Sequence, residues 1–193
     1  MFESVKTGQY YGLPEEPFNF ESVSTWISAL DEARRLKSSR IDTGHLLVAF
    51  LYSKATIVED FQSFFGLIDR KELELRNGLA YQALRSSGAN LKDARRHLID
   101  IIGYGDTPYK IKKLVGRIPL DERPNSAGVS LAAKRAAAWS QKLGTAQIGD
   151  QHLLLGLLDE PDAVITELLK KMCIDADKLR QSILDLVNQK SID

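Results

Sequence analysis

Apolar residues recur at steps of three and four along most of this chain, which is the spacing of helices with one buried face. The clearest stripe follows Val23 and comprises Trp26, Ile27, Leu30, Ala33 and Leu36. The same spacing predicts further helices over about 43–51, 57–65, 69–84, 91–102, 126–143, 150–158, 161–172 and 175–187. No stretch alternates apolar and polar residues for long enough to predict a sheet, so we expect an all-α fold.

Turn-forming residues interrupt this helical pattern at two places. The segment 86–90, which reads Ser-Ser-Gly-Ala-Asn, predicts a break. The stretch 107–125 contains Pro108, Pro119 and Pro124 and predicts a connector with one or two helical turns. After this connector the helical pattern of the first half returns.

The second half of the chain repeats the first. Residues 41–51, Ile-Asp-Thr-Gly-His-Leu-Leu-Val-Ala-Phe-Leu, align with residues 148–158, Ile-Gly-Asp-Gln-His-Leu-Leu-Leu-Gly-Leu-Leu, at an offset of 107 residues. The offset holds upstream without a gap and shifts by one downstream, where Leu73 meets Leu179. We therefore predict two four-helix repeats related by a pseudo-twofold axis, with the second helix central in each.

Both copies of this motif also indicate how their short helix begins. Thr43 and Asp150 stand where an N-cap is expected to accept hydrogen bonds from the first free amides. Ile41 and Ile148 precede them and are expected to pack back over the helix start. The helix that follows carries apolar residues on nearly all of its faces, which predicts that it is buried in the middle of its repeat.

These features resemble the Clp N-terminal repeat, which occurs twice at the head of ClpA- and ClpC-type unfoldases. The resemblance covers about residues 18–75 and 118–188 and is carried by Glu-Ala-x-x-Leu at 32–36, the two histidine motifs, and Ile-Asp-x-x-x-Leu at 174–179. It implies two pseudo-twofold-related four-helix repeats with a helical insertion between them. The implied division is an N-terminal extension (1–17), repeat 1 (18–85), an insertion and linker (86–125) and repeat 2 (126–190).

The resemblance also implies a function. It indicates a non-catalytic protein-binding module of the Clp chaperone–protease system, an adaptor, accessory or regulatory subunit that docks a Clp ATPase, a ClpP-type protease core, an adaptor or a protein substrate. The sequence contains no Gly-x-x-x-x-Gly-Lys-Ser/Thr segment, so we expect no ATPase activity from it. In this it resembles stand-alone Clp-N proteins and the plastid ClpT accessory subunits, and a fragment of a longer chaperone is the alternative.

The composition of the chain disfavours some classes of partner. Lys plus Arg and Asp plus Glu are both 26, and this zero net charge disfavours a dedicated nucleic-acid binder. A single cysteine excludes an intramolecular disulfide, and neither a secretory signal nor a run of about 18 apolar residues is present. We expect a protein of the cytoplasm, or of the plastid stroma in a plant lineage, without a membrane or nucleic-acid partner.

Three histidines and one cysteine invite a chemical interpretation that a structural one outweighs. His45 and His152 occupy equivalent positions, and duplication explains the pair if each ring is buried and hydrogen-bonded to a nearby carbonyl or carboxylate. Cys173 lies between Met and Ile and favours a small buried hydrophobe over a reactive thiol. His97 follows two arginines and is expected on a solvated face. We therefore expect no catalytic residue, no metal and no cofactor.

The resemblance supplies a sharper test of binding. In ClpC-type N-domains a glutamate directly before the motif histidine, assisted by a threonine that caps the first helix of the same repeat, helps to hold phosphoarginine tags. The glutamate positions are Gly44 and Gln151 here, and the capping positions are Asn19 and Ser126. Neither glycine nor glutamine offers the carboxylate that pairs with a guanidinium. These four residues are therefore candidate protein- or peptide-binding positions, but not for phosphoarginine.

The insertion offers a second candidate surface. Tyr104 and Tyr109 suit an interface as well as ordinary packing. The basic stretch 109–117 is either a solvated connector or a contact for phosphate or an acidic partner. Two further functions stay open as alternatives, namely a small helical enzyme or stress protein that has reused the fold, and a nucleic-acid-binding helical protein.

Overall fold

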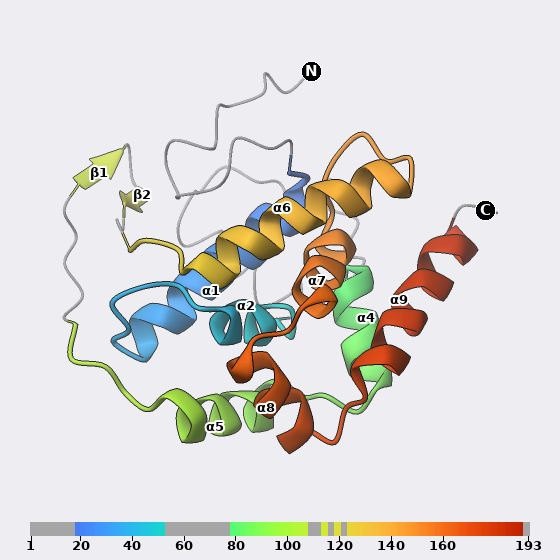
Figure 1. Ribbon diagram of the computed structural model, residues 1–193. Coiled ribbons are helices and arrows are strands. Elements are labelled where there is room, and N and C mark those ends of the chain that lie inside the picture. Colours follow the sequence, from blue (N-terminus) through green and yellow to red (C-terminus); the bar gives the residue numbers. More distant parts are fainter. Residues whose placement is uncertain (1–17, 53–77, 108–112, 116–117, 121–122, 191–193) are drawn as a thin grey trace, which may run out of the picture.

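The computed structural model describes residues 18–52, 78–107, 113–115, 118–120 and 123–190. These residues form α1 (Phe20–Arg35), α2 (Thr43–Ala49), α4 (Leu79–Ser86), α5 (Leu91–Ile102), β1 (Lys113–Val115), β2 (Ile118–Leu120), α6 (Ala127–Lys142), α7 (Asp150–Asp159), α8 (Ala163–Lys171) and α9 (Ala176–Lys190). The helices pack around one another with the small hairpin at their margin (Figure 1). The prediction of an all-α fold is confirmed.

Contacts between helices display the predicted pseudo-twofold arrangement. α1 packs on α2 as α6 packs on α7, and α2 contacts α5 and α8 as α7 contacts α9 and α4. The remaining large contacts, α4 with α9 and α5 with α8, are equivalent to each other. α5 therefore makes the contacts in the first half that α9 makes in the second. The predicted boundaries, which place residues 91–102 in an insertion, stay a prediction, and the predicted pair Leu73–Leu179 lies partly outside the described residues.

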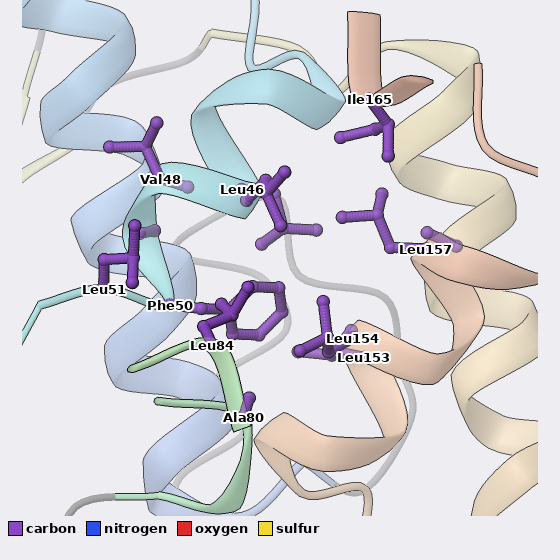
Figure 2. Packing of buried hydrophobic residues seen from close by; sticks show 14 of the residues in the cluster. Leu46, Val48, Phe50, Leu51, Ala80, Leu84, Leu153, Leu154, Leu157 and Ile165 are labelled. Atoms are coloured by element: carbon purple, nitrogen blue, oxygen red, sulfur yellow. The ribbon is translucent and has the colours of Figure 1, made fainter. Parts of the chain in front are cut away.

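The core lies where the two halves meet. The central helices, α2 and α7, supply half of the twelve largest fully buried side chains, and they are apolar on nearly all of their faces as predicted. Figure 2 shows side chains of α2, α4, α7 and α8 pointing into this shared core, including Leu46, Leu84, Leu154 and Ile165. Neither half therefore encloses a separate core of its own.

Two crossed backbone bridges join the halves. Phe18 pairs with Ile148, and Asn125 pairs with Ile41, both in parallel. The amide of Asn19 donates to the carbonyl of Ile148 at 3.0 Å, and that of Ser126 donates to the carbonyl of Ile41 at 2.8 Å. Both bridges follow the 107-residue offset, so each long helix begins against the segment that leads into the short helix of the other half.

The short helices begin at the predicted residues, but their N-caps lie one residue earlier than predicted. Asp42 and Gly149 are the N-caps of α2 and α7, and Thr43 and Asp150 are the first helical residues. The reason is the histidine at the third helical position, whose Nδ1 accepts from the amide of the N-cap residue. The N-cap assignment of Thr43 and Asp150 is therefore wrong by one position.

The structure also corrects the helices predicted for the middle of the chain. The predicted helix 57–65 lies outside the described residues, but a continuous helix over 69–84 is wrong because Gly78 is the N-cap of α4. A β-carbon on Gly78 would lie 1.8 Å from Oδ2 of Asp150, so a larger residue here would have to displace this carboxylate. In the connector, where helical turns were expected, β1 and β2 pair antiparallel.

Candidate functional site

The four candidate residues lie at the starts of the long and short helices. Asn19 is the N-cap of α1, and its Oδ1 accepts from the amide of Ser22 at 3.0 Å. Ser126 is the N-cap of α6, and its Oγ accepts from the amide of Val129 at 3.3 Å. The capping role expected of both residues is thus confirmed, whereas their binding role stays a prediction.

The crossed bridges change which candidates lie near each other. The family resemblance pairs each cap with the motif of its own repeat, Asn19 with Gly44 and Ser126 with Gln151. The structure instead places the cap of α1 against Ile148, three residues before Gln151. It likewise places the cap of α6 against Ile41, three residues before Gly44. Each candidate site is therefore composed of one residue from each repeat.

The site that contains Gly44 is closed. Gly44 is buried in α2, and a β-carbon on it would lie 2.4 Å from Cδ1 of Leu98 and 2.8 Å from Cγ1 of Val164. The helices α5 and α8 supply these two side chains and cover the position. A carboxylate side chain at residue 44 has no room, which supports the expectation that this half does not bind a guanidinium through a glutamate.

Polar side chains seal the rim of this closed site. Thr43 Oγ1 donates to Oδ2 of Asp162 at 2.7 Å, and Oδ1 of Asp162 caps α8 by accepting from the amide of Ile165 at 3.0 Å. Gly128 of α6 sits against both groups, because a β-carbon there would lie 2.9 Å from Cγ2 of Thr43. The starts of α2, α6 and α8 are therefore locked together.

The site that contains Gln151 is more open. Gln151 is half-buried at the second position of α7, and its side chain folds back over Gly149. A β-carbon on Gly149 would lie 2.3 Å from the Oε1 of Gln151. The amide of Gln151 offers one donor and one acceptor group to a ligand and no charge.

The geometry of the two motif histidines indicates a structural role. His45 and His152 are completely buried, and their Nδ1 atoms accept from the backbone amides of Asp42 and Gly149 at 2.9 and 2.8 Å. Nδ1 of each ring therefore accepts from a backbone N–H group. The prediction of a carbonyl or carboxylate partner is wrong for Nδ1. Burial lowers the pKa of each imidazole to about 4, so both are neutral near pH 7.

A buried carboxylate network lies outside the positions predicted from the sequence. Glu32 of α1 is fully buried and accepts from Nε of Arg35 at 3.0 Å, from Nε of Arg95 at 2.7 Å and from the hydroxyl of Tyr52. Burial alone raises the pKa of Glu32, but the hydrogen bonds from these three side chains outweigh it and hold the pKa below its usual value. The available signal was the Glu-Ala-x-x-Leu motif itself, in which Glu32 stands next to the apolar stripe.

The second repeat holds a related but more exposed arrangement. Nε1 of Trp139 donates to Oδ2 of Asp159 at 2.8 Å, and Nη2 of Arg180 donates to the carbonyl of Leu158 at 2.5 Å. Lys142 lies over the Trp139 ring, 4.3 Å from its centroid. These contacts fasten the end of α6 and the start of α9 to the end of α7.

The remaining predicted positions fall outside the two sites. Tyr104 is 62% exposed in the loop after α5, and Tyr109 lies outside the described residues. Cys173 is exposed at a φ of 58° in the turn before α9, so the prediction of a buried small hydrophobe is wrong. His97 is half-buried, with Nδ1 3.8 Å from Asp100, where a solvated face was expected.

Neither a metal centre nor a membrane helix emerges from the part of the chain that the structure describes. Within it, no group of three or more His, Cys, Asp or Glu side chains is arranged to hold a metal ion. None of its helices combines the length and the apolar character that crossing a membrane requires.

Comparison with known proteins gives both sequence and structural relatives. Residues 125–192 match the family described as the Clp repeat (R) N-terminal domain. The chain is 30% identical over 176 residues to the ATP-dependent Clp protease ATP-binding subunit ClpA homolog of Cyanidium caldarium, and 29% identical over 172 residues to that of Guillardia theta. The alignments cover 91% and 89% of this chain but 17% of each relative. The chain therefore spans about a sixth of the length of these curated relatives.

Solved structures agree on the fold. The N-terminal domain of the chaperone ClpD from Arabidopsis thaliana matches with a TM-score of 0.61 at 18% identity, covering 89% of this chain and 95% of that one. The N-terminal domain of Hsp104 from Candida albicans matches with a TM-score of 0.55 at 17% identity, covering 89% and 91%. At these identities the likeness establishes the fold.

Proposed function

The chain contains a Clp N-terminal repeat domain, whose homologues are the N-domains of Clp ATPases, and on this premise we propose that it is a protein-docking module of a Clp chaperone–protease system. The single observation that carries the proposal is the extent of the similarity. It runs over about nine tenths of this chain and is confined to about a sixth of the ATPase subunits. The module has no chemistry of its own and acts by bringing a Clp ATPase, a protease core, an adaptor or a substrate into contact.

Ligand binding is assigned to the more open of the two helix-start sites. The site around Gly44 is filled by Leu98 and Val164, whereas Gln151 is half-buried beside the segment that meets the cap of α1. A neutral amide and the cap Asn19 suit a peptide backbone or an uncharged polar side chain. Phosphoarginine is not the proposed ligand, because neither position supplies a carboxylate.

The experiment is a binding measurement with purified components. The immobilised chain is exposed to the Clp ATPase and the Clp protease core of the same organism, first separately and then together, and binding is followed by interferometry. We expect a dissociation constant in the micromolar range with at least one component, as for a transient docking interface. Gln151→Arg is expected to weaken binding about tenfold, because it places a charged, larger side chain in the open site.

Gln141→Arg is the matched control, since it makes the same change at an exposed position of α6. Equal loss in both variants would show a general charge effect rather than a site at Gln151. Absence of binding to every Clp component at high micromolar concentration, with the chain folded by circular dichroism, would overturn the proposed function.

A further inference from the structure

Glu32 holds two arginines close together at the surface of the first repeat. Its Oε2 atom accepts from Nε and Nη2 of Arg35 at 3.0 and 2.5 Å, and its Oε1 atom accepts from Nε and Nη2 of Arg95 at 2.7 and 2.5 Å. The carboxylate is completely buried, whereas the side chains of Arg35 and Arg95 are 36% and 31% exposed. Two guanidinium groups, one from α1 and one from α5, therefore meet over a single buried anion while their side chains reach solvent.

Each of these arginines keeps N–H groups that the described residues do not use. A guanidinium has five N–H donors in a rigid planar fork. Arg35 binds Glu32 through Nε and Nη2, and Arg95 uses the same two atoms, with Nη2 also donating to the hydroxyl of Tyr52. Within the part of the chain that the structure describes, no group accepts a hydrogen bond from Nη1 of either arginine. The two Nη1 groups are therefore available to a ligand.

The surroundings fix both guanidinium groups before any ligand binds. Glu32 orients each of them through two N–H groups, and Cζ of Arg95 lies 5.1 Å from the centroid of the Tyr52 ring, which packs against it. An arginine that is free in solvent loses rotamer freedom when it binds a ligand, and this loss weakens binding. Arg35 and Arg95 have already lost much of that freedom on folding, so the pair is preorganised.

The second repeat arranges its equivalent cations differently. Lys142 occupies the position of Arg35 at the offset of 107 residues and lies over an indole ring. Arg180 of α9 occupies the position of Arg95, because α9 makes the contacts that α5 makes in the first half. The guanidinium of Arg180 donates to Oδ1 of Asp177 and to a backbone carbonyl of α7, both at 2.5 Å. A pair of arginines over one buried carboxylate is thus a property of the first repeat.

The charge at this cluster indicates the class of ligand. The carboxylate of Glu32 offsets one of the two guanidinium charges, so an excess of one positive charge remains, which a single further carboxylate would neutralise. Asp31 and Asp93 stand beside the cluster in sequence and are 44% and 40% exposed, so they oppose a continuous polyanion such as a nucleic acid. Lys92 is exposed one turn before Arg95 on α5 and adds attraction for a neighbouring acidic residue.

We propose that Arg35 and Arg95 together bind a carboxylate side chain in an acidic segment of a partner protein. The Nη1 group of each arginine donates a charge-assisted hydrogen bond to this carboxylate, while Glu32 keeps both guanidinium groups in place from below. The inference rests on the proposed docking function and adds a second point of contact, made by residues other than those of the helix-start site at Gln151.

The direct test uses a rhodamine-labelled peptide in which glutamate alternates with serine over about nine residues, roughly 30 Å when extended. Fluorescence anisotropy measures its affinity for the full chain. We expect a dissociation constant on the order of 100 μM at low ionic strength, which rises with salt. The same peptide with glutamine in place of glutamate is expected to bind at least about tenfold more weakly, because it carries no charge. The Nε–H resonances of Arg35 and Arg95 in the NMR spectrum are expected to shift with the acidic peptide alone.

Three variants of the chain separate the role of the fork from that of charge. Arg35→Gln leaves Glu32 bound to Arg95 and Tyr52, and is expected to weaken binding of the acidic peptide about fivefold. Arg35→Lys keeps the charge but loses the planar fork, and is expected to weaken it roughly threefold. Arg180→Gln makes the matched change in the second repeat and is expected to leave binding unchanged. The glutamine peptide and the NMR shifts keep the test valid if Arg35→Gln disturbs the fold.

Three results would overturn this inference. They are equal binding of the glutamine peptide, equal weakening by Arg35→Gln and Arg180→Gln, and tighter binding of a single-stranded oligonucleotide of the same charge, which would indicate a nucleic-acid site. The Clp-binding measurement keeps the two proposals apart. Binding of a Clp component without binding of the acidic peptide rejects the carboxylate site and leaves the docking function in place. Peptide binding that depends on Arg35, without binding of any Clp component, rejects the docking function and keeps the carboxylate site.

Discussion

Glu32 in the first repeat and Trp139 in the second lie 107 residues apart at the same position of the long helix, yet one accepts hydrogen bonds and the other donates. Their partners, Tyr52 and Asp159, stand at equivalent positions after the short helix, so the roles of donor and acceptor are exchanged. The first network is buried and holds a carboxylate, while Asp159 is exposed. The comparison shows that the link between these helix ends is maintained although its chemistry is not, and that the first repeat is the more sensitive to its loss.

The two sites that contain the motif histidines also differ in burial, and again the first repeat is the more buried. The residue before the histidine is a buried glycine in the first repeat and a half-buried glutamine in the second. In the first repeat this position is part of the packed interior, and in the second repeat it is partly accessible. The predictions below test this division of roles.

The largest effect is expected from placing the same residue at both positions. Gly44→Glu is expected to destabilise the chain by about 4 kcal/mol, because it forces an unpaired carboxylate against Leu98 and Val164. Gln151→Glu is expected to change stability by less than about 0.5 kcal/mol. Urea unfolding followed by circular dichroism measures both, and similar losses would contradict the contrast between a closed and an open site.

The buried carboxylate provides the next test. Glu32→Gln is expected to cost about 2 to 3 kcal/mol, less than for a completely buried pair because Arg35 and Arg95 are each about one third exposed. Asp159→Asn is the matched change in the second repeat and is expected to cost at most about 0.5 kcal/mol, since the amide oxygen can still accept from Trp139. Urea unfolding midpoints compare the two. A larger loss in Asp159→Asn would reverse the assignment of the sensitive repeat.

Acid is expected to destabilise the chain through the motif histidines. The pKa of His45 is about 4 in the folded chain and about 6.5 when unfolded, so the unfolded state binds the extra proton between these values. Stability is complete above about pH 6.5 and falls toward pH 4 by up to about 1.4 kcal/mol per pH unit. His152 acts in the same direction.

His45→Gln supplies the control for this titration, because glutamine at the third helical position can also accept from the amide of the N-cap without binding a proton. The variant is expected to flatten the dependence of the unfolding free energy on pH between 4 and 6.5. A slope identical to that of the original chain would show that other groups, such as buried carboxylates, cause the acid sensitivity.

The smallest expected effects concern two pairs of equivalent turns, each of which contains a residue in the left-handed conformation. After the long helices, Lys37 has φ 53° and its equivalent Gly144 has φ 67°. Before α5 and α9, Gly88 has φ 89° and its equivalent Cys173 has φ 58°. Lys37→Gly and Cys173→Gly are each expected to stabilise the chain by about 0.5 to 1 kcal/mol, by relieving steric strain at positive φ. Thermal unfolding measures the gain, and a lower midpoint would show that the side chains contribute contacts worth more than the strain.

Local patterns were enough to predict most of the fold. The apolar spacing located α5 to within a residue, and the duplicated histidine motif revealed the pseudo-twofold arrangement before any contact was known. Periodicity and duplication are properties of sequence alone, which is why these predictions succeed. The errors lie where a distant residue decides, as at Gly78, whose break depends on the approach of Asp150.

The candidate site could be predicted only in part. Asn19 and Ser126 were correctly identified as caps because capping is local. Their proximity to the motif of the opposite repeat depends on the crossed bridges, which no local pattern encodes. The burial of Glu32 likewise depends on Arg95, contributed by a helix 63 residues away. Cys173 was misplaced because apolar neighbours indicate burial in a helix but not in a turn.

The crossed bridges at Phe18–Ile148 and Ile41–Asn125 also bear on how such a fold can arise. Each repeat completes the start of its long helix only with a segment of the other repeat. A single repeat would satisfy both bridges by pairing with a second copy of itself, as in an isologous dimer with twofold symmetry. The chain is thus equivalent to a symmetric homodimer whose subunits have been fused through the connector. Once fused, the two halves are free to diverge, one toward packing and the other toward the binding proposed above, without breaking the symmetry that holds them together.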